Sequence, residues 1–315
     1  MKGKWGWCIT FHALVLAIFL TLNYLYTHSL FYRSLEGVIQ YDSIQSDLQI
    51  VNFGASHAAN GIDYSVCPEY RSFNFAFGSQ SLYFDSLVFD KYKEHFGQDC
   101  VVIFDIFYAS LYSDPKFRFQ ETLPRYSRVL DIDKIPDVTF EDLLIFRYFP
   151  VLGAQKRLIR IFVKNERVEQ KNPALFLNDS EAAAFSGDGW LYETGAERAR
   201  EHLTEITDVV PEEADAFLHM LELCKENHWK AVVVSTPLTI YYHSAFSTEL
   251  LDMFHNDLSE LLSNYPGVPY LDYTTDERFY DQLQYFTDVD HLNYEGRIMF
   301  TAILVDDLKQ MGLLP

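Results

Sequence analysis

Two groups of residues at opposite ends of the chain have the chemistry needed for nucleophilic catalysis. Ser56 lies in the sequence Val-Asn-Phe-Gly-Ala-Ser-His, directly after an apolar segment, and Asp288 and His291 lie three residues apart near the C-terminus. A serine hydroxyl is a weak nucleophile until a neighbouring base takes its proton. A carboxylate three residues before a histidine can turn back to its Nδ1, so that Nε2 faces the serine. The three residues therefore predict a Ser-His-Asp triad.

Each of these residues also has a simpler interpretation on its own. Ser56 is of a type common at helix caps and turns, Asp288 is a turn former, and His291 can be a hydrogen-bonded loop histidine. Asp290 adds another metal-binding side chain, but no further His/Asp pair at ligand spacing accompanies this segment, so we expect no metal and no other cofactor. Other histidines, including His57, have no supporting spacing and are interpreted as surface or satisfied core residues.

The elements that must position these residues alternate between short apolar runs and helical patterns, as in a parallel sheet with crossover helices. Ser56 follows the first strand and the Asp288 to His291 segment follows the last, so both lie at the carboxyl edge of one sheet. This joint placement favours the triad over the separate interpretations. The sequence predicts a three-layer α/β/α fold with strands at 48–53, 72–76, 100–107, 230–235 and 268–272, and helices at 81–96, 211–229, 248–265 and 294–311.

Residues 113 to about 210 interrupt this alternation and are predicted to form a mostly helical insertion. The insertion contains a helical stretch from Phe140 to Lys164 and a loop with the sequence Gly187-Asp-Gly-Trp190. It also contains a basic cluster in an otherwise acidic region, formed by Lys156, Arg157, Arg160, Lys164 and Arg167. The cluster is interpreted either as a solvated helix face or as a contact with anionic lipid head groups or a membrane partner.

The composition excludes several classes of protein. Hydrophobic residues make up 49% of the 315, which is ample for a folded core, and 25 Lys and Arg residues stand against 45 Asp and Glu residues, for a formal net charge of −20. Such an acidic chain would repel nucleic-acid phosphates, so no nucleic-acid role is expected. Cys67, Cys100 and Cys224 are an odd number and no Cys-x-x-Cys pair exists, which argues against a disulfide scaffold, a zinc ribbon or thioredoxin-like chemistry.

The first 33 residues differ in kind from the rest of the chain. They contain Lys2, Lys4 and Arg33 but no acidic residue, which leaves a formal charge of −23 on residues 34–315. The uncharged stretch between Lys4 and Arg33 is long enough to cross a bilayer, and we predict one transmembrane helix from about Trp7 to Tyr26. A cleaved signal peptide is the alternative, but its apolar region would be shorter, and no A-x-A-like site follows. The aromatic residues expected at the membrane interfaces are Trp5, Trp7, Tyr24 and Tyr26.

This anchor sets the predicted domain organisation. The N-terminal lysines favour a cytoplasmic N-terminus, because positive charge is retained on the cytoplasmic side of membranes. Residues 1–33 are therefore predicted to form a cytoplasmic stub and membrane anchor. Residues 34–315 are predicted to form an extracytoplasmic domain with the insertion at about 113–210.

Three segments together resemble the SGNH/GDSL hydrolase superfamily, over about residues 45–312 without the insertion. Gly-Ala-Ser56 is similar to its nucleophile block, Phe73-Asn-Phe-Ala-Phe-Gly78 to its second block, and Asp288-x-x-His291-Leu-Asn-x-x-Gly296 to its last block. The resemblance implies that Ser56 attacks an acyl ester with the help of His291 and Asp288. It also implies that the backbone N–H groups of Ser56 and Gly78 form the oxyanion hole.

One departure from the superfamily concerns that oxyanion hole. The third block of the superfamily supplies an asparagine as a further donor, but residues 104–110 read Phe-Asp-Ile-Phe-Tyr-Ala-Ser, without one. The loss of one such donor can lower a rate by about 10²–10³-fold. Asn74, Gln80 and Tyr108 are the candidate replacements, and without a replacement catalysis would be weak.

Within the superfamily, the anchor, the insertion and the C-terminal Asp-x-x-His most resemble the branch with the D-alanyl transfer protein of teichoic-acid D-alanylation and related surface-polymer O-acyltransferases. This resemblance implies a single-pass protein of a bacterial cell membrane that works with a multipass membrane O-acyltransferase on a glycan or other surface polymer. The charge of −23 on residues 34–315 suits a neutral glycan better than a polyphosphate. The sequence does not separate an esterase from a transferase. A catalytically degenerate scaffold on the same fold is the rival interpretation, because of the missing asparagine.

Overall fold

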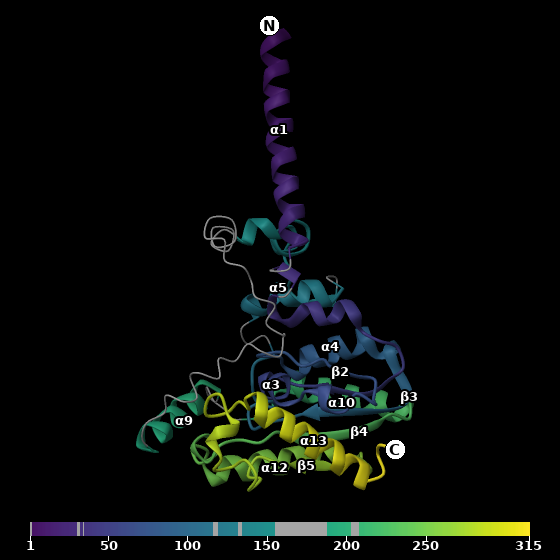
Figure 1. Ribbon diagram of the computed structural model, residues 1–315, viewed down its shortest axis with the longest axis vertical. Helices are drawn as coiled ribbons and strands as arrows, with labels where there is room; N and C mark the ends of the chain where they lie inside the picture. Colours follow the sequence, from purple (N-terminus) through teal and green to yellow (C-terminus); the bar gives the residue numbers. More distant parts are fainter. Residues whose placement is uncertain are drawn as a thin grey trace. The chain divides into compact units, whose positions relative to one another are not determined.

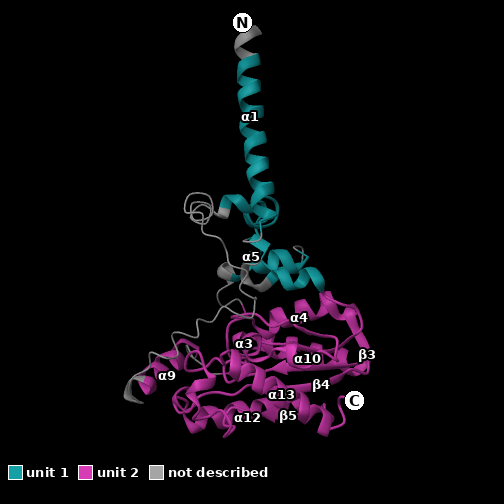
Figure 2. Ribbon diagram, in the orientation of Figure 1, with its two compact units in different colours: residues 1–43, 120–173 teal, residues 44–119, 174–315 magenta. Residues whose placement is uncertain are grey.

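The structure is a computed structural model of the chain, and it describes residues 2–29, 32–33, 35–115, 119–131, 134–154, 188–202 and 208–315 (Figure 1). The chain divides into two compact units, one with residues 1–43 and 120–173 and the other with residues 44–119 and 174–315 (Figure 2). The predicted basic cluster from Lys156 to Arg167, and Gly187 of the predicted loop, lie outside the described residues.

The second unit is built on a five-stranded parallel sheet with the strand order β2-β1-β3-β4-β5. This is the order of flavodoxin-like doubly wound sheets, which bind ligands at the carboxyl edge between β1 and β3. The predicted α/β class with a central parallel sheet is therefore confirmed. The strands are β1 (Leu48–Phe53), β2 (Ser72–Asn74), β3 (Phe96–Asp105), β4 (Lys230–Ser235) and β5 (Tyr270–Asp272).

The inner strands form because β1, β3 and β4 are almost continuous apolar runs that suit a sheet covered on both faces. Residues 100–105 of β3 and 231–235 of β4 are all buried. The bounds of β1 and β4 agree with the prediction, but β3 begins four residues earlier, at Phe96, which pairs with Leu48 of β1. The polar residues 97–99 hide this start in the sequence. The helix predicted to reach Phe96 accordingly ends before it.

Helices cover both faces of the sheet (Figure 1). On one face Phe53 of β1 and Phe104 of β3 stack on each other, and they contact Phe89 of α4 and Phe217 of α10. On the other face α3 and α13 pack onto a buried cluster from the same strands, which includes Ile50. The helices are α3 (Ser56–Gly61), α4 (Leu82–Tyr92), α9 (Asp188–His202), α10 (Pro211–Glu226), α11 (Ile240–His243), α12 (Thr248–Leu262) and α13 (Tyr294–Gln310), and the 3-10 segments are η2 (Tyr64–Val66), η3 (Lys93–His95) and η8 (Leu283–Tyr285).

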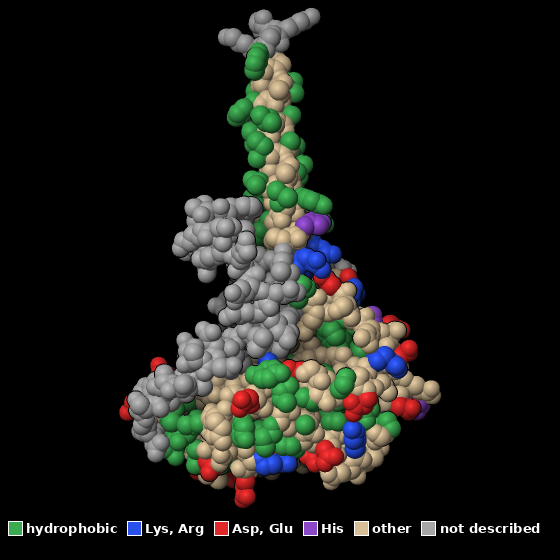
Figure 3. Space-filling view, viewed as in Figure 1, with side chains coloured by type: hydrophobic (Ala, Val, Ile, Leu, Met, Phe, Trp, Pro, Cys, Tyr) green, Lys and Arg blue, Asp and Glu red, His purple; other side chains and the backbone are tan. Residues whose placement is uncertain are grey.

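The first unit contains α1 (Lys2–Thr27), in which Gly6–Thr27 is long and apolar enough to cross a membrane. Its hydrophobic side chains, such as Trp7 and Leu14, are exposed, as Figure 3 shows for this helix. Asn23 joins α1 to a second segment of the unit, because its side chain donates to the carbonyl oxygen of Tyr148 (3.0 Å) and accepts from the N–H of Val151 (3.3 Å).

The other elements of the first unit are short. The stretch predicted as one helix from Phe140 is divided into α6 (Phe140–Asp142), the π-helical η5 (Leu143–Tyr148) and the 3-10 segment η6 (Pro150–Ala154), and its part after Ala154 lies outside the described residues. Pro150 explains the break, because proline lacks the N–H that would continue a helix. The remaining elements are η1 (Leu35–Ser43) and α5 (Phe119–Val129).

Candidate active site

Ser56 lies where β1 passes into α3, at the carboxyl edge of the sheet. Gly54 makes this turn with a φ of 140°, in the region that residues with a side chain rarely adopt. A Cβ atom on Gly54 would lie 2.8 Å from the Cβ of Asp105, at the end of β3. Glycine is therefore required there, and it brings the first turn of α3, with Ser56, close to the end of the neighbouring strand.

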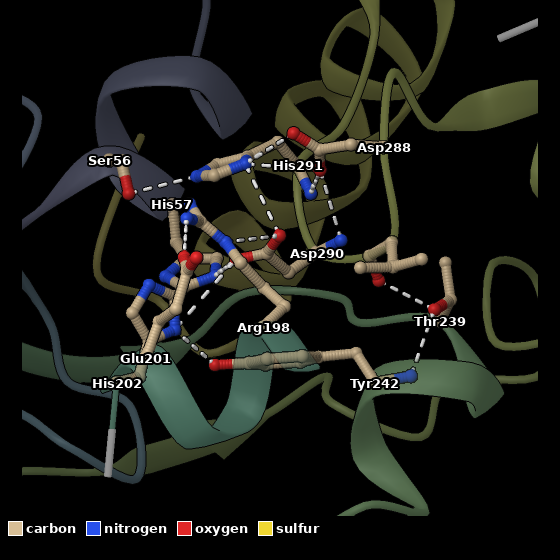
Figure 4. A network of polar contacts seen from close by, with 11 residues as sticks. Ser56, His57, Arg198, Glu201, His202, Thr239, Tyr242, Asp288, Asp290 and His291 are labelled. Atoms are coloured by element: carbon tan, nitrogen blue, oxygen red, sulfur yellow. Dashed lines mark hydrogen bonds and ion pairs between the residues drawn. The ribbon is translucent and has the colours of Figure 1, made fainter. Parts of the chain in front are cut away.

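The three residues of the predicted triad lie within hydrogen-bonding distance in the order that the chemistry needs (Figure 4). His291 Nε2 lies 2.8 Å from Ser56 Oγ. On the other side of the ring, His291 Nδ1 lies 3.1 and 3.0 Å from the two carboxylate oxygens of Asp288. The structure thus brings together residues from opposite ends of the chain, and the contact with Asp288 favours the tautomer whose Nε2 can accept the proton of Ser56.

The loop before α13 holds His291 through its own backbone. Asp288 Oδ1 accepts hydrogen bonds from the N–H groups of Asp290 (3.1 Å) and His291 (2.8 Å), so one carboxylate shapes the loop and contacts the imidazole. Asn293 caps α13, because its Oδ1 accepts from the N–H of Gly296 (3.0 Å). A side chain on Gly296 would collide with the carbonyl oxygen of Tyr285. The later residues of the Asp-x-x-His motif are therefore structural.

A second carboxylate, Asp290, lies beside the triad and was missed as a functional residue in the sequence. Its Oδ1 lies 3.5 Å from His291 Nδ1, and its Oδ2 lies 3.3 Å from Nε2 of His57. Arg198 of α9 donates through Nε to both oxygens of Asp290, at 3.2 and 3.3 Å. His202, also of α9, has its Nδ1 2.6 Å from the hydroxyl of Tyr242 and 4.0 Å from Asp290.

The adjacency of Asp290 to His291, and of His57 to Ser56, is the only signal in the sequence that could have found this network. Arg198 and His202 come from residues 188–202, within the predicted insertion, where nothing in the spacing points to the site. The residues of α9 therefore have no role in the sequence-based prediction. The sequence left His57 as either a surface or a satisfied core residue; the structure buries it, with its ring facing the site.

The charges around His291 set its protonation. Burial by itself lowers the pKa of His291, but the carboxylates of Asp290 and Asp288 outweigh burial and raise the pKa to about 9. The pKa of Asp290 lies well below its ordinary value although burial opposes this, because His291, His57 and Arg198 favour the carboxylate. Burial lowers the pKa of His57, and it lowers the pKa of His202 to about 3. At neutral pH the site therefore contains one charged imidazole, that of His291.

A cavity of about 240 Å³ opens beside Ser56. Ser56 and Gly78, the two predicted oxyanion-hole residues, both line it, and Arg198 and His202 line it from α9. A Cβ atom added to Gly78 would meet nothing within 4 Å, so there is open space on the side where a side chain would lie. The cavity is large enough to receive a small acyl group or a sugar ring beside the hydroxyl of Ser56.

Buried carboxyl groups form another part of the cavity lining. Burial raises the pKa of Asp85 and of Asp105 to about 7, and that of Glu213 to about 8. Asp105 Oδ1 accepts from the N–H of Thr236 (3.2 Å), and Glu213 Oε2 accepts from the N–H of Tyr83 (2.9 Å). Among the described residues, their other oxygens, Asp105 Oδ2 and Glu213 Oε1, have no hydrogen-bond partner. These acidic groups in the lining disfavour an anionic ligand.

The side chains predicted to replace the missing oxyanion donor are engaged elsewhere. The amide group of Asn74 donates to the carbonyl oxygens of Ala58 (3.1 Å) and Ile62 (3.0 Å). The amide group of Gln80 donates to the carbonyl oxygen of Phe75 (3.1 Å) and to Asp85 (2.6 Å). Since an amide has two N–H donors, both side chains are committed to the fold. The structure does not support either one as the replacement.

Tyr108, the third candidate donor, also lies where it cannot serve as the replacement. Its ring packs edge-on against Phe246 and Phe254, with centroid distances of 4.9 and 5.3 Å. Tyr108 is fully buried and is not among the residues that line the cavity beside Ser56. The near-continuous apolar run that ends β3 continues through this position, so its side chain belongs to the packing around α12.

His57, Asp290 and His291 each offer a metal-ligand atom, and these atoms lie within 4.8 Å of one another. The chemistry of the surroundings does not suit a cation. Arg198 already contacts both oxygens of Asp290, and its fixed positive charge would repel a metal ion. His291 in turn contacts Ser56 and Asp288. The donor set is better explained as a hydrogen-bonded network than as a metal centre.

Comparison of the chain with protein-family models gives no match, and comparison with curated proteins gives none either. Among solved structures, the chain is similar to a candidate acylhydrolase from Bacteroides fragilis, with 10% sequence identity and a TM-score of 0.42 over 88% of this chain and 95% of that one. At this TM-score the likeness carries no functional argument. Function is therefore inferred from the site itself.

Proposed function

We propose that the protein is a membrane-anchored serine esterase or O-acyltransferase that acts on acyl esters of a surface polysaccharide or related polymer. The observation that carries this proposal is the chain of contacts from Ser56 Oγ through His291 to the carboxylate of Asp288. A nucleophile, a base and a carboxylate that orients the base are the parts required for acyl transfer through a covalent intermediate.

In this mechanism the neutral form of His291 takes the proton of Ser56 through Nε2 as Ser56 Oγ attacks the ester carbonyl. Asp288 holds Nδ1–H and stabilises the imidazolium that forms. The backbone N–H groups of Ser56 and Gly78 receive the developing oxyanion. His291 then gives its proton to the leaving alcohol. A second alcohol or a water molecule gives its proton to His291 as it attacks the acyl group, and His291 returns that proton to Ser56 Oγ as the bond between Ser56 and the acyl group breaks.

The cavity favours an uncharged acceptor. The carboxyl groups of Asp105 and Glu213 belong to its lining, and their ionised forms would repel phosphate or carboxylate groups of a ligand. Water as acceptor makes the enzyme an esterase, and a sugar hydroxyl makes it an O-acyltransferase.

The apolar helix Gly6–Thr27 is proposed as a single-pass anchor with a cytoplasmic N-terminus in a bacterial cell membrane. A multipass membrane O-acyltransferase is the proposed partner that supplies acyl groups.

The proposal is tested by labelling the full-length chain in detergent with a serine-reactive fluorophosphonate, at pH 7 and at pH 9. Wild type should be labelled, and Ser56→Ala and His291→Ala should not, with circular dichroism as the check that each variant folds. A folded wild type that takes up no label at either pH, and releases no acetate from an acetyl ester, would refute the enzymatic function. Incubation of the labelling-competent protein with an acetyl donor and a neutral oligosaccharide, followed by mass spectrometry, then separates transfer from hydrolysis.

A scaffold without catalysis is the second candidate, and one observation favours it. Asn74 and Gln80 use their amide donors inside the fold, so neither restores the donor that the superfamily's third block would supply. A scaffold predicts that Ser56→Ala leaves polymer acylation in cells unchanged. An enzyme predicts that the same substitution abolishes it at equal protein abundance.

A further inference from the structure

Asp290 contacts the imidazole of His291 in a way that the three-residue triad does not explain. Its side chain is completely buried, whereas 43% of the Asp288 side chain is exposed. Its Oδ1 lies 3.5 Å from His291 Nδ1, the same nitrogen that contacts Asp288. An ionic interaction is screened least where water is excluded. The more distant carboxylate can therefore act on His291 as strongly as the nearer one.

The position of Asp290 is fixed from α9. Arg198 Nε donates to both of its oxygens, and Arg198 Nη1 donates to Glu201 (2.9 Å) one turn further along the helix. Figure 4 shows the Arg198 side chain running from α9 toward the Asp290 carboxylate and the Ser56–His291 pair. A buried carboxylate that touches an arginine over both oxygens has little freedom to rotate. Arg198 thus holds Asp290 in the orientation that faces His291.

The groups that face His291 from each packed element define its electrostatic surroundings. Its own loop supplies Asp288 and Asp290, and α9 supplies Arg198 and His202, with Glu201 behind Arg198. From α3, the ring of His57 lies against His291, and Tyr242 of α11 contacts His202. Burial keeps His57, His202 and Tyr242 uncharged at neutral pH, because it lowers the pKa of both histidines and raises that of Tyr242. The charges nearest to His291 are therefore two negative carboxylates and one positive guanidinium.

We propose that Asp290 is a positioning residue of the active site, a second carboxylate partner of His291 that Arg198 holds in place, so that α9 helps to set the basicity of His291. Asp290 favours the protonated imidazole and Arg198 opposes it. The two residues therefore act on His291 in opposite directions although they contact each other. The effect of Asp290 and Arg198 on the reaction rate rests on the proposed function. Their effect on the protonation of His291 does not depend on any reaction.

The test uses two variants of the full-length chain, Asp290→Asn and Arg198→Gln, with Glu222→Gln as the matched control. Glu222 is an exposed carboxylate on α10 that pairs with Lys225, so its loss removes one negative charge without touching the site. The titration of His291 is followed by NMR with [13Cε1]histidine, and the signal is assigned by its absence in His291→Asn. The pH dependence of fluorophosphonate labelling is measured on the same samples.

The midpoint of the His291 titration should fall by at least one pH unit in Asp290→Asn, should rise in Arg198→Gln, and should stay unchanged in Glu222→Gln. The labelling profile should shift by the same amounts, and its plateau should fall about tenfold in Asp290→Asn because the imidazole is less well held. If Asp290 and Arg198 had a purely structural role, both substitutions would lower the labelling plateau, but the His291 midpoints of the two variants would not move apart.

Unchanged midpoints, or shifts of the same sign in both variants, would overturn the proposal. If Asp290→Asn fails to fold, Arg198→Gln decides alone, since a midpoint that falls or stays in place contradicts the role of Arg198. If wild type takes up no label, the proposed catalytic function fails, yet the NMR midpoints still decide whether Asp290 and Arg198 control His291.

Discussion

The imidazole rings of His57 and His291 lie nearly parallel, with an angle of 19° between their planes and 5.0 Å between their centroids. His57 comes from the first turn of α3, directly after Ser56, and His291 comes from the loop before α13. Burial lowers the pKa of His57, so this ring is neutral at pH 7 and adds no positive charge beside His291. The stacked ring therefore restrains the plane in which His291 Nε2 meets Ser56.

His57→Phe should keep this restraint, and His57→Ala should lose it. Phenylalanine retains a ring against His291, so the labelling rate at pH 9 should stay within about tenfold of wild type, as expected when only one weak polar contact is lost. Alanine leaves a void at a buried position and should lower the free energy of unfolding by about 2–4 kcal/mol. Denaturant unfolding and labelling rates check both variants. An alanine variant as stable and as reactive as the phenylalanine variant would contradict this role.

The labelling rate of Ser56 in wild type should rise steeply above neutral pH. Only the unprotonated imidazole can take the proton of Ser56, and the carboxylates around His291 raise its pKa to about 9 despite burial. The rate should increase about tenfold from pH 7 to pH 8 and level off above pH 9. The measurement is the second-order labelling rate, corrected for spontaneous hydrolysis of the probe with Ser56→Ala. A rate that is flat between pH 6 and pH 9 would show that His291 is already neutral there.

The sequence predicted the parts of the site that depend on strand order, because apolar runs reveal which segments form the sheet. Ser56 after β1 and His291 before α13 meet at one edge for that reason. It could not predict that Arg198 reaches Asp290, since α9 lies in a segment whose pattern gives no register against the sheet. Local spacing carries no information on a contact between residues 92 positions apart.

The roles given to Asn74 and Gln80 failed for a related reason. An amide in a sequence shows that donors exist, but their partners are decided by packing. Here the carbonyl oxygens of Ala58 and Phe75 accept those donors. In the same way, the acidic composition does not show which acids are buried, and Glu213 is completely buried beside the cavity. Burial of single charged residues follows from tertiary structure and leaves no periodic trace.

The buried acids should make the protein less stable as the pH rises above about 5. The pKa values of Asp85, Asp105 and Glu213 are raised by burial to about 7, 7 and 8, above the value of about 4 for an exposed carboxyl. Their protonated forms stabilise the fold fully below pH 4, and this contribution is lost as the pH passes through 7 and 8. The lowered pKa of Asp290 acts in the opposite sense and removes stability at acid pH.

Urea unfolding of the full-length chain should therefore give the largest free energy of unfolding near pH 5 and a smaller one at pH 9. Glu213→Gln imitates the protonated acid and should lose less stability over this range than wild type. Glu222→Gln, which changes an exposed carboxylate of the same helix, should follow wild type. Stability that increases from pH 5 to pH 9, or an equal decline in Glu213→Gln, would contradict the assignment of these carboxyls as protonated in the fold.

Gly54→Ala should destabilise the fold strongly, and Gly78→Ala should not, although both glycines line the same cavity. Gly54 has a φ of 140°, and a Cβ there would lie 2.8 Å from that of Asp105, so the substitution adds backbone strain to a steric clash. We expect a loss of at least about 2 kcal/mol in Gly54→Ala. At Gly78 an added Cβ meets nothing within 4 Å, so the free energy of unfolding should change by less than about 0.5 kcal/mol. Denaturant unfolding of the two variants side by side measures the difference, and equal losses would mean that the turn before Ser56 tolerates a side chain.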